Sequence, residues 1–377
     1  MLNKPVVIYI ITKLELGGAQ KVCLNLLDGL QQDGQTAYLI SGNEGTLLSE
    51  IKNKKNIIFL NSLKREVKNP FLEVKNFLKL VSILKNLKKK HANIIVHTHS
   101  TKAGFIGRWA ALFAGIKRRI HTVHGFGFHE HQNFIFWLIN YFLEFITSLI
   151  TTNYICVSYN DQNIGKKLLP RFIHKSTVIR AAVNNQAFIA AHLDTQKLNF
   201  NETTFIFGTI ACFKKQKNLF DLLKAFKELC KVNTNCKLEI IGDGSLRSAI
   251  ESWIRDNKLK NKITLLGWQT EVAPVMLNWQ AFVMSSLWEG LPCAIIEARL
   301  LKLPIISYDV GGIKEVVLNG KNGLLLKPKD WLGLTYAMLQ LASSSIIQRN
   351  LSSFKEDLSP FYASNMIKMH QDFYNAN

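Results

Sequence analysis

Short apolar runs alternate with longer amphipathic stretches along the 377-residue chain. In the first half these runs are rich in β-branched residues and contain few polar positions, which is typical of parallel strands buried on both faces. The expected strands are residues 6–11, 38–40, 57–60, 94–97, 120–122 and 154–157, with helices at 19–31 and 70–90. This half therefore predicts an α/β unit.

The same alternation starts again after about residue 185. The expected strands are residues 205–210, 238–241, 263–265, 281–284, 304–307 and 323–326, with helices at 219–230, 245–257, 292–302 and 331–342. A chain of this length is too long for one ordinary core. The pattern predicts two doubly wound domains joined by the polar segment 184–201. A cleft between them would hold ligands at the carboxyl ends of the strands.

The positive charge is concentrated in the first half. Of the net +20, residues 1–200 contribute +15 (26 Lys and Arg against 11 Asp and Glu) and residues 201–377 contribute +5 (21 against 16). Such an excess favours a polyanionic partner, which could be a nucleic acid, an anionic membrane face or a phosphorylated acceptor. A lysine-rich surface that only faces solvent would account for the excess of positive charge equally well.

The spacing of the cysteines and the short N-terminal apolar run predict a cytoplasmic protein. The six cysteines form no CxxC pair, as expected of reduced thiols. The apolar run 6–12 is too short for the core of a signal peptide, so we interpret it as a buried strand.

One apolar segment stands out at residues 134–150, FIFWLINYFLEFITSLI. Its 17 residues reach only the lower limit for spanning a bilayer, and Asn140 and Glu144 interrupt it. Spanning is therefore not expected. Two interpretations remain: an aromatic helix in the membrane interface beside a basic domain, or a core helix packed against a sheet.

The most informative stretch of the second half is EGLPCAIIE, residues 289–297. Pro292 suits the first turn of a helix, so the preceding residues form a strand-to-helix turn whose backbone N–H groups can meet a phosphate. Gly290 lets a ligand approach the backbone closely. Glu289 and Glu297 then supply two acceptors suited to sugar hydroxyls, although a capping glutamate followed by a solvated one fits the same spacing.

Two further glycine turns follow strands of the second half. Gly311-Gly312 comes after 304–307 and precedes Glu315, and Gly242-Asp243-Gly244 closes 238–241. Three glycine-containing strand ends in one domain indicate a bound ligand.

Lysines follow the first strand of this domain, in the segment CFKKQKN at residues 212–218. Lys214, Lys215 and Lys217 are placed to neutralise a diphosphate leaving group. A solvated lysine loop is the alternative.

The first half contains two motifs that are weaker evidence for a ligand site. Gly17-Gly18 follows the first strand and opens a helix, where a phosphate could approach, but the third glycine of a dinucleotide fingerprint is missing. His124-Gly125 lies at a strand end, where a neutral imidazole could donate to a sugar hydroxyl or simply be a bonded core histidine. Neighbouring histidines lack the companions of a zinc motif, so no metal is expected.

Taken together, these motifs resemble the family 4 retaining glycosyltransferases of GT-B fold over nearly the whole chain. The E-G-L-P-x4-E segment followed by the G-G-x-x-E turn is the specific part; the other motifs add order and spacing. The resemblance implies a first domain of residues 1–185 plus about 360–377, which binds the acceptor, and a second of residues 186–359, which binds the nucleotide sugar.

The resemblance also implies roles for single residues of the second domain. Glu297 would hold the nucleotide ribose and Glu289 the sugar ring, while the backbone at Gly290 and Leu291 would meet the sugar or a phosphate. Lys217 would stabilise the departing phosphate. The turn at Gly242 would belong to the same donor site.

In the first domain, Gly17 and Gly18 would approach the diphosphate and His124 the sugar. One departure is that Cys212 stands where the family commonly has an arginine beside the lysine. Lys214 would have to supply that charge from a different position.

The implied reaction moves a sugar, with retention, from a nucleotide diphosphate sugar, UDP-linked by the resemblance, to a hydroxyl of a lipid-linked or cell-envelope saccharide. No cofactor and no nucleic-acid partner are expected, and an anionic membrane surface is a candidate partner of a cytoplasmic, peripheral enzyme. A nucleotide-sugar epimerase of the same architecture and a catalytically silent saccharide-binding scaffold are the rival hypotheses.

Overall fold

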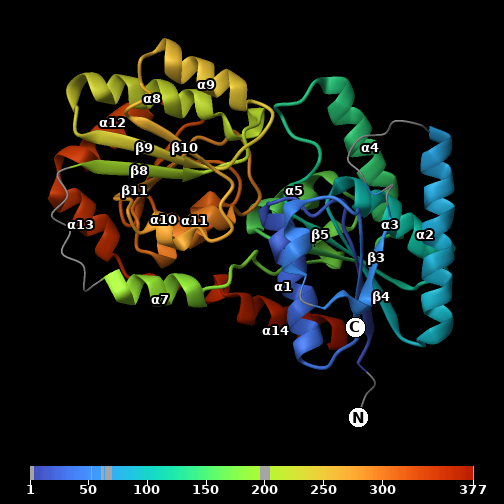
Figure 1. Cartoon of the computed structure of the whole chain (residues 1–377). Helices are drawn as coiled ribbons and strands as arrows, with labels where there is room; N and C mark the ends of the chain where they lie inside the picture. The colour runs from blue at the N-terminus through green and yellow to red at the C-terminus, as the bar shows by residue number, and fades with distance from the viewer. Residues whose placement is uncertain (1–3, 52, 61–62, 64–69, 196–203, 377) are drawn as a thin grey trace. The chain divides into compact units, whose positions relative to one another are not determined.

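The computed structural model describes the chain except for residues 1–3, 52, 61–62, 64–69, 196–203 and 377 (Figure 1). The chain divides into two compact units. The first comprises Met1–Val183 together with Pro360–Asn377, and the second is Asn184–Ser359.

The first unit is built on a seven-stranded parallel sheet in the order β3-β2-β1-β4-β5-β6-β7. The strands are β1 Val6–Ile10, β2 Ala37–Ser41, β3 Ile57–Phe59, β4 Ile94–His99, β5 Arg118–Val123, β6 Asn153–Cys156 and β7 Ser176–Val178. Its helices are α1 Gly18–Gln32, α2 Pro70–Lys90, α3 Thr101–Phe113, α4 Phe134–Ile150, α5 Tyr159–Leu168, α6 Phe172–Lys175 and α14 Ala363–Ala376. Alternate residues of the buried β1 face opposite sides: Ile8 and Ile10 belong to the core formed with α2 and α3.

The second unit is built on a six-stranded parallel sheet in the order β10-β9-β8-β11-β12-β13. The strands are β8 Phe205–Ile210, β9 Cys236–Ile241, β10 Ile263–Gly267, β11 Ala281–Met284, β12 Ile305–Tyr308 and β13 Gly323–Leu326. Its helices are α7 Gln186–Thr195, α8 Leu219–Val232, α9 Arg247–Asp256, α10 Ala273–Met276, α11 Cys293–Leu300, α12 Trp331–Ser343 and α13 Ser345–Ser353. The expected fold class, two doubly wound α/β units, is confirmed.

The prediction of a polar linker over residues 184–201 is wrong for the part that the structure describes. Helix α7 occupies Gln186–Thr195 and contacts α10 and α11 of the second unit. The physical reason is a short apolar run around Phe188, whose side chain is buried. The remaining residues, 196–201, lie outside the described part of the chain.

The C-terminal helix α14 joins the first unit through a buried polar cluster. The hydroxyl of Tyr374 lies 2.5 Å from Nδ1 of His97 and 3.2 Å from the hydroxyl of Tyr9. Nε2 of His97 bonds Oγ1 of Thr122 at 2.6 Å, and the ring of His370 stacks near that of His97. Burial lowers the pKa of His97 well below its usual 6.5 and that of His370 to about 4. Both imidazoles are therefore neutral in the folded protein.

A buried ion pair fastens α4 to α3. The guanidinium of Arg108, which is completely buried, donates to both carboxylate oxygens of Glu144 at 2.8 and 2.7 Å. It also donates to the backbone oxygen of Gly104 and to the side chains of Thr151 and Tyr154. Glu144, which interrupts the apolar segment in the sequence, thus faces inward as a paired carboxylate.

We predict that Glu144→Ala lowers the free energy of unfolding of the first unit by about 3–5 kcal/mol, because it leaves a buried guanidinium without its counter-ion. Urea denaturation measures the change. The control is Glu130→Ala at an exposed carboxylate, expected within about 0.5 kcal/mol of the parent. An equally small effect of Glu144→Ala would contradict a stabilising role for the pair.

The neutral histidines predict a pH dependence of stability. Because the folded state lowers these pKa values below 6.5, the unfolded chain takes up protons first, and stability falls as the pH drops from about 6.5 towards about 4. In His370→Gln the free energy of unfolding should fall less steeply with decreasing pH, by up to about 1.4 kcal/mol per pH unit. Denaturation between pH 7 and 5 tests this, with His174→Gln at an exposed position as the control; equal slopes for all three proteins would refute it.

Candidate active site

The strand order of each sheet reverses at one place, which is where ligands of doubly wound folds bind. In the second unit the reversal lies between β8 and β11, and in the first between β1 and β4. The loops that follow these strands, and those that follow β9, β12 and β5, contain most of the residues expected from sequence. Each unit is described by itself.

The centre of the second unit's edge is the ion pair between Lys217 and Glu289. Nζ of Lys217 lies 2.5 Å from Oε1 of Glu289, although the residues are 72 positions apart. Gln216, which the sequence analysis passed over, fixes the geometry: its Nε2 donates to the backbone oxygen of Trp288 at 2.7 Å. Ser285 adds a hydroxyl that donates to the backbone oxygen of Lys217. A cation and a carboxylate are thus held together at the ends of β8 and β11.

The glycine turn after β12 packs directly against this pair. Gly311 has a φ of +59°, and a Cβ there would lie 2.0 Å from the backbone oxygen of Glu289. The N–H of Gly312 donates to the backbone oxygen of Gly290 at 2.7 Å. Only glycine at position 311 allows the two loops to lie this close together.

The turn after β9 packs on the first part of the β8 loop in a similar way. Gly242 has a φ of +130°, and a Cβ there would lie 1.9 Å from the backbone oxygen of Ala211. The N–H of Phe213 donates to the backbone oxygen of Asp243. Arg247, a cation that the sequence analysis missed, pairs with the Asp243 carboxylate at 2.9 Å. The position of Arg247, three residues after the Gly-Asp-Gly turn, is the sequence feature that could have identified it.

Helix α11 begins one residue later than the sequence predicted. Pro292 is not in the first turn: it precedes the helix with an extended backbone, and the helix starts at Cys293. An extended conformation is equally compatible with the fixed φ of proline. Leu291 and Glu297 are both buried, the latter in the middle of α11, so Glu297 is not a solvated helix glutamate.

The lysines of the loop after β8 differ in burial. Lys214 is half-buried and precedes the single 3-10 turn Lys215–Lys217, while Lys215 is exposed. Cys212 is also half-buried. The structure therefore places Lys214 and Lys217 on one short loop, and it is Lys217 whose side chain reaches Glu289.

In the first unit, Gly17 and Gly18 lie where the chain enters α1 after β1. Gly17 precedes the helix and Gly18 is its first residue. Thr12 and Ser100, which follow β1 and β4, approach each other through their hydroxyls at 3.3 Å. This contact links the segments that follow β1 and β4.

His124 follows β5 and pairs with another histidine. Its Nε2 lies 3.0 Å from Nδ1 of His99, the last residue of β4. Burial, and in second place the proximity of His370, lowers the pKa of His124 to about 3. His124 is therefore a neutral hydrogen-bonding group. Among the described residues, no three His, Cys, Asp or Glu side chains are grouped so that they could hold a metal ion.

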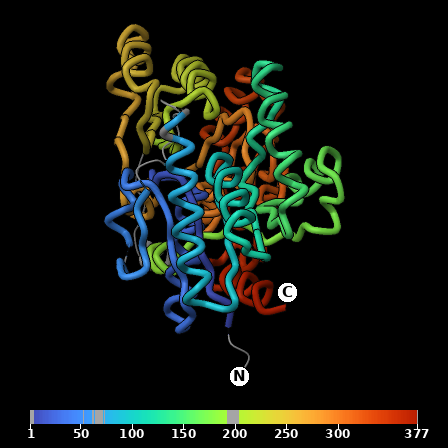
Figure 2. The backbone as a smooth tube through the Cα atoms, turned by 90° about the vertical axis from the view of Figure 1, so that its right-hand side faces the viewer, coloured from blue at the N-terminus to red at the C-terminus, as the bar shows by residue number. Residues whose placement is uncertain are grey.

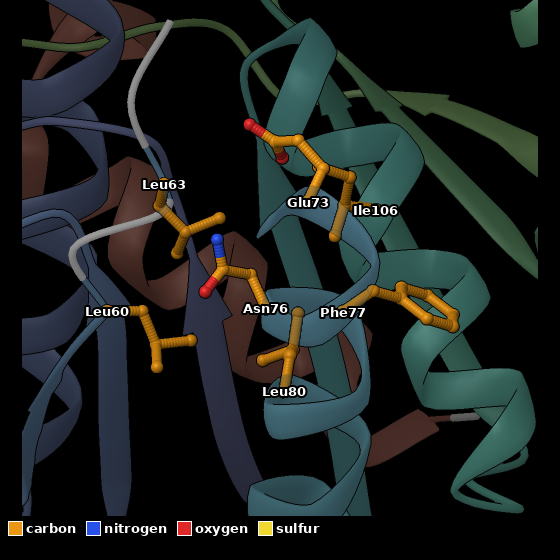
Figure 3. A pocket seen from close by; sticks show the side chains of 7 residues that line it. All are labelled: Leu60, Leu63, Glu73, Asn76, Phe77, Leu80 and Ile106. Carbon is orange, nitrogen blue, oxygen red and sulfur yellow. The ribbon is translucent and has the colours of Figure 1, made fainter. Parts of the chain in front are cut away.

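A small recess elsewhere in the first unit contains none of the expected site residues. It lies between α2, α3 and the segment after β3 (Figure 3). Leu60, Leu80 and Ile106 give it an apolar lining, and its one carboxylate, Glu73, bonds Lys102 at 2.9 Å. The described residues that line the recess include no group that is suited to a sugar phosphate.

Known proteins match both halves of the chain. Residues 16–186 match the family model described as Glycosyltransferase Family 4, and residues 192–356 match the model described as Glycosyl transferases group 1. The Escherichia coli UDP-Gal:alpha-D-GlcNAc-diphosphoundecaprenol alpha-1,3-galactosyltransferase is 30% identical over 339 residues, which cover 88% of this chain and 86% of the relative.

Two further proteins agree with this match. The Staphylococcus aureus capsular polysaccharide biosynthesis glycosyltransferase CapM is 23% identical, with 86% of this chain and 85% of the relative covered. The crystal structure of Anabaena HepE in complex with UDP-glucose has a TM-score of 0.81 at 16% identity, with 99% of this chain and 100% of that chain covered, and shows the same GT-B fold. The resemblance noted from the sequence is thereby confirmed: the chain belongs to glycosyltransferase family 4.

Proposed function

We propose that this glycosyltransferase moves a sugar from a UDP-sugar to a hydroxyl of a lipid-linked or cell-envelope saccharide, with retention at the anomeric carbon. The observation that carries the proposal is the Lys217–Glu289 pair held against the Gly311 turn at the ends of β8, β11 and β12. The names of the relatives support it, since they act on a diphosphoundecaprenol-linked sugar and in capsule synthesis. HepE was crystallised with UDP-glucose.

In this proposal the second unit binds the donor. Glu297 accepts hydrogen bonds from the ribose hydroxyls and Glu289 from the sugar ring. The backbone at Gly290 and Leu291 meets the sugar or a phosphate, since glycine leaves the N–H groups accessible. The turn at Gly242 lines the same site.

Two lysines stabilise the negative charge of the leaving group. As the bond between the anomeric carbon and the diphosphate oxygen breaks, negative charge collects on the diphosphate, and Lys217 and Lys214 stabilise it. The acceptor hydroxyl forms the new bond on the face that the diphosphate leaves, and its proton passes to the departing phosphate oxygen. Glu289 keeps the Lys217 ammonium in place before the donor binds.

The first unit contributes the acceptor side and part of the donor contacts. Gly17 and Gly18, at the N-terminus of α1, approach the diphosphate without a side chain in the way. His124, neutral and partly accessible, bonds the transferred sugar.

We also propose that the first unit docks on an anionic membrane, because the polarity of α4 is inverted. Its buried residues are polar (Glu144, Thr147 and Ser148), whereas its exposed residues are apolar. The exposed side chains are Phe134, Ile135, Phe136, Leu138, Ile139, Phe142 and Leu149, with exposed fractions of 48–72%. A helix on a water-facing surface shows the opposite pattern. No helix in the described part of the chain combines the length and apolarity that crossing a bilayer needs.

Neighbouring helices add apolar area and positive charge. Helices α2, α3 and α4 lie side by side, α2 against α3 and α3 against α4 (Figure 2). Helix α2 exposes Phe71, Val74 and Leu78 together with Lys75, Lys79, Lys85, Lys88, Lys89 and Lys90. Apolar insertion combined with lysine attraction to anionic headgroups is the usual way in which an interfacial helix binds.

We predict that Lys217→Ala lowers kcat by about 100- to 1000-fold, because one stabilising contact to the departing diphosphate is lost. Turnover of UDP-sugars with a diphosphoundecaprenol-linked saccharide measures this. The matched control is Lys215→Ala, two residues away and exposed, which should turn over like the parent.

Binding separates the donor site from the chemistry. UDP at about 100 times its dissociation constant should add roughly 2.7 kcal/mol of stability, seen as a raised melting temperature. No shift with UDP, or a Lys217→Ala enzyme as active as the parent, would reject this donor site. Release of free sugar-nucleotide isomers without an acceptor would instead favour an epimerase.

The membrane proposal predicts that the triple substitution Phe134→Ser, Phe136→Ser and Phe142→Ser weakens binding to anionic vesicles at least about tenfold, because each buried phenyl contributes about 1.5–3 kcal/mol. Flotation with phosphatidylglycerol-containing vesicles measures it. Activity on a short-chain, soluble acceptor should be retained.

The matched control changes three exposed apolar residues of the second unit, Val232, Leu332 and Tyr336, to serine. Vesicle binding should stay at the level of the parent. Equal loss in both triple variants, or no binding by the parent at low salt, would refute docking through α4.

A further inference from the structure

Two imidazoles meet at the ends of neighbouring strands in the first unit. His99 is the last residue of β4, and His124 follows the last residue of β5, with His99 and Thr122 paired in the sheet register. Nδ1 of His99 lies 3.0 Å from Nε2 of His124, and the ring centroids are 5.3 Å apart. At this distance one of the two nitrogens carries a hydrogen and the other accepts it.

The surroundings of His99 restrict which nitrogen that is. Its side chain is completely buried against the rings of His97 and Tyr9. Its other nitrogen, Nε2, is buried and has no hydrogen-bond partner among the residues that the structure describes. Burial lowers the pKa of both His99 and His124, so each ring carries a single N–H.

Only two arrangements are then open. If His124 donated through Nε2, the hydrogen of His99 would have to be on its own Nε2, as a buried N–H without an acceptor. If His99 donates through Nδ1, its Nε2 is only an unused acceptor. Orphaned buried donors are rarer in folded proteins than unused acceptors, so the second arrangement is favoured.

We propose that His99 is a positioning residue that donates through Nδ1–H to Nε2 of His124 and so keeps the hydrogen of His124 on Nδ1. His124 then meets its ligand as a hydrogen-bond donor. This inference rests on the proposed role of His124 in binding the transferred sugar.

The assigned tautomer limits what His124 does in transfer. Its only basic nitrogen is occupied by His99, so His124 neither removes the proton of the acceptor hydroxyl nor accepts a hydrogen bond from the sugar. Instead, Nδ1–H donates to a sugar oxygen. A fixed donor orients a hydroxyl or ring oxygen of the donor sugar before bond breaking begins.

Long-range ¹H–¹⁵N NMR of histidine-labelled protein tests the assignment directly, with the signals of His124 identified by their loss in His124→Gln. We expect a protonated, pyrrole-type Nδ1 and an unprotonated, pyridine-type Nε2. The reverse pattern in the parent protein overturns the proposal, whether or not the His99 variants fold and whether or not transfer is detected.

Two substitutions of His99 separate tautomer control from packing. His99→Asn can present an amide N–H close to the position of Nδ1 and should keep the Nδ1–H form of His124. His99→Leu removes the donor, so the tautomers of His124 should mix, and kcat/KM for the UDP-sugar should fall by at least about tenfold. His121→Asn, on the other face of β5 where Nδ1 bonds Thr98, is the buried control and should leave the His124 signals unchanged.

The transfer activity and the NMR signals of the His99 variants must change together if the proposal is correct. Retention of activity and of the Nδ1–H signals in His99→Asn but not in His99→Leu supports the proposal. Unchanged His124 signals in His99→Leu, or full transfer activity in that variant, overturns it without affecting the donor site around Lys217.

Discussion

The candidate donor site depends on the close approach of two backbone loops, at Gly311 and at Glu289. A side chain at position 311 would collide with the Glu289 carbonyl, so the turn after β12 packs there only as glycine with a positive φ. With that turn in place, Gly312 bonds Gly290 and the loop after β11 has a fixed path. The Glu289 carboxylate is thereby directed to the Lys217 ammonium, which a loop free to move would not hold.

Sequence reasoning reached the fold because the strands are buried on both faces. Runs such as Val6–Ile10 and Phe205–Ile210 are apolar without alternation, and helix-length segments separate them, so two doubly wound units followed from the pattern. The short α7 was missed because its apolar residues run together without the spacing of an amphipathic helix. The position of Pro292 differed by one residue, which is the usual uncertainty of a helix end.

The site could be predicted as a set of motifs but not as a set of contacts. Glycine turns and lysines at strand ends are visible in the chain, and their residue types indicate phosphate and sugar chemistry. The partners are not visible, because Lys217 finds Glu289 across 72 positions and Arg108 finds Glu144 across 36. Such pairs are created by the strand order, which brings distant loops and helices together. Gln216 and His99 could not be recognised from the sequence for the same reason, because each acts on another residue that is distant in the chain.

The candidate binding residues of the two units differ in their electrostatics. In the second unit a lysine pre-paired with a carboxylate supplies positive charge, which suits a diphosphate whose charge grows as the bond breaks. In the first unit, burial disfavours the charged form of the imidazoles and lowers the pKa values of His97, His99 and His370, so these rings are neutral. What remains there is a neutral N–H, which suits a sugar oxygen that stays uncharged during transfer. A cation at that place would attract a phosphate instead, so burial of the histidine cluster makes His124 better suited to an uncharged oxygen.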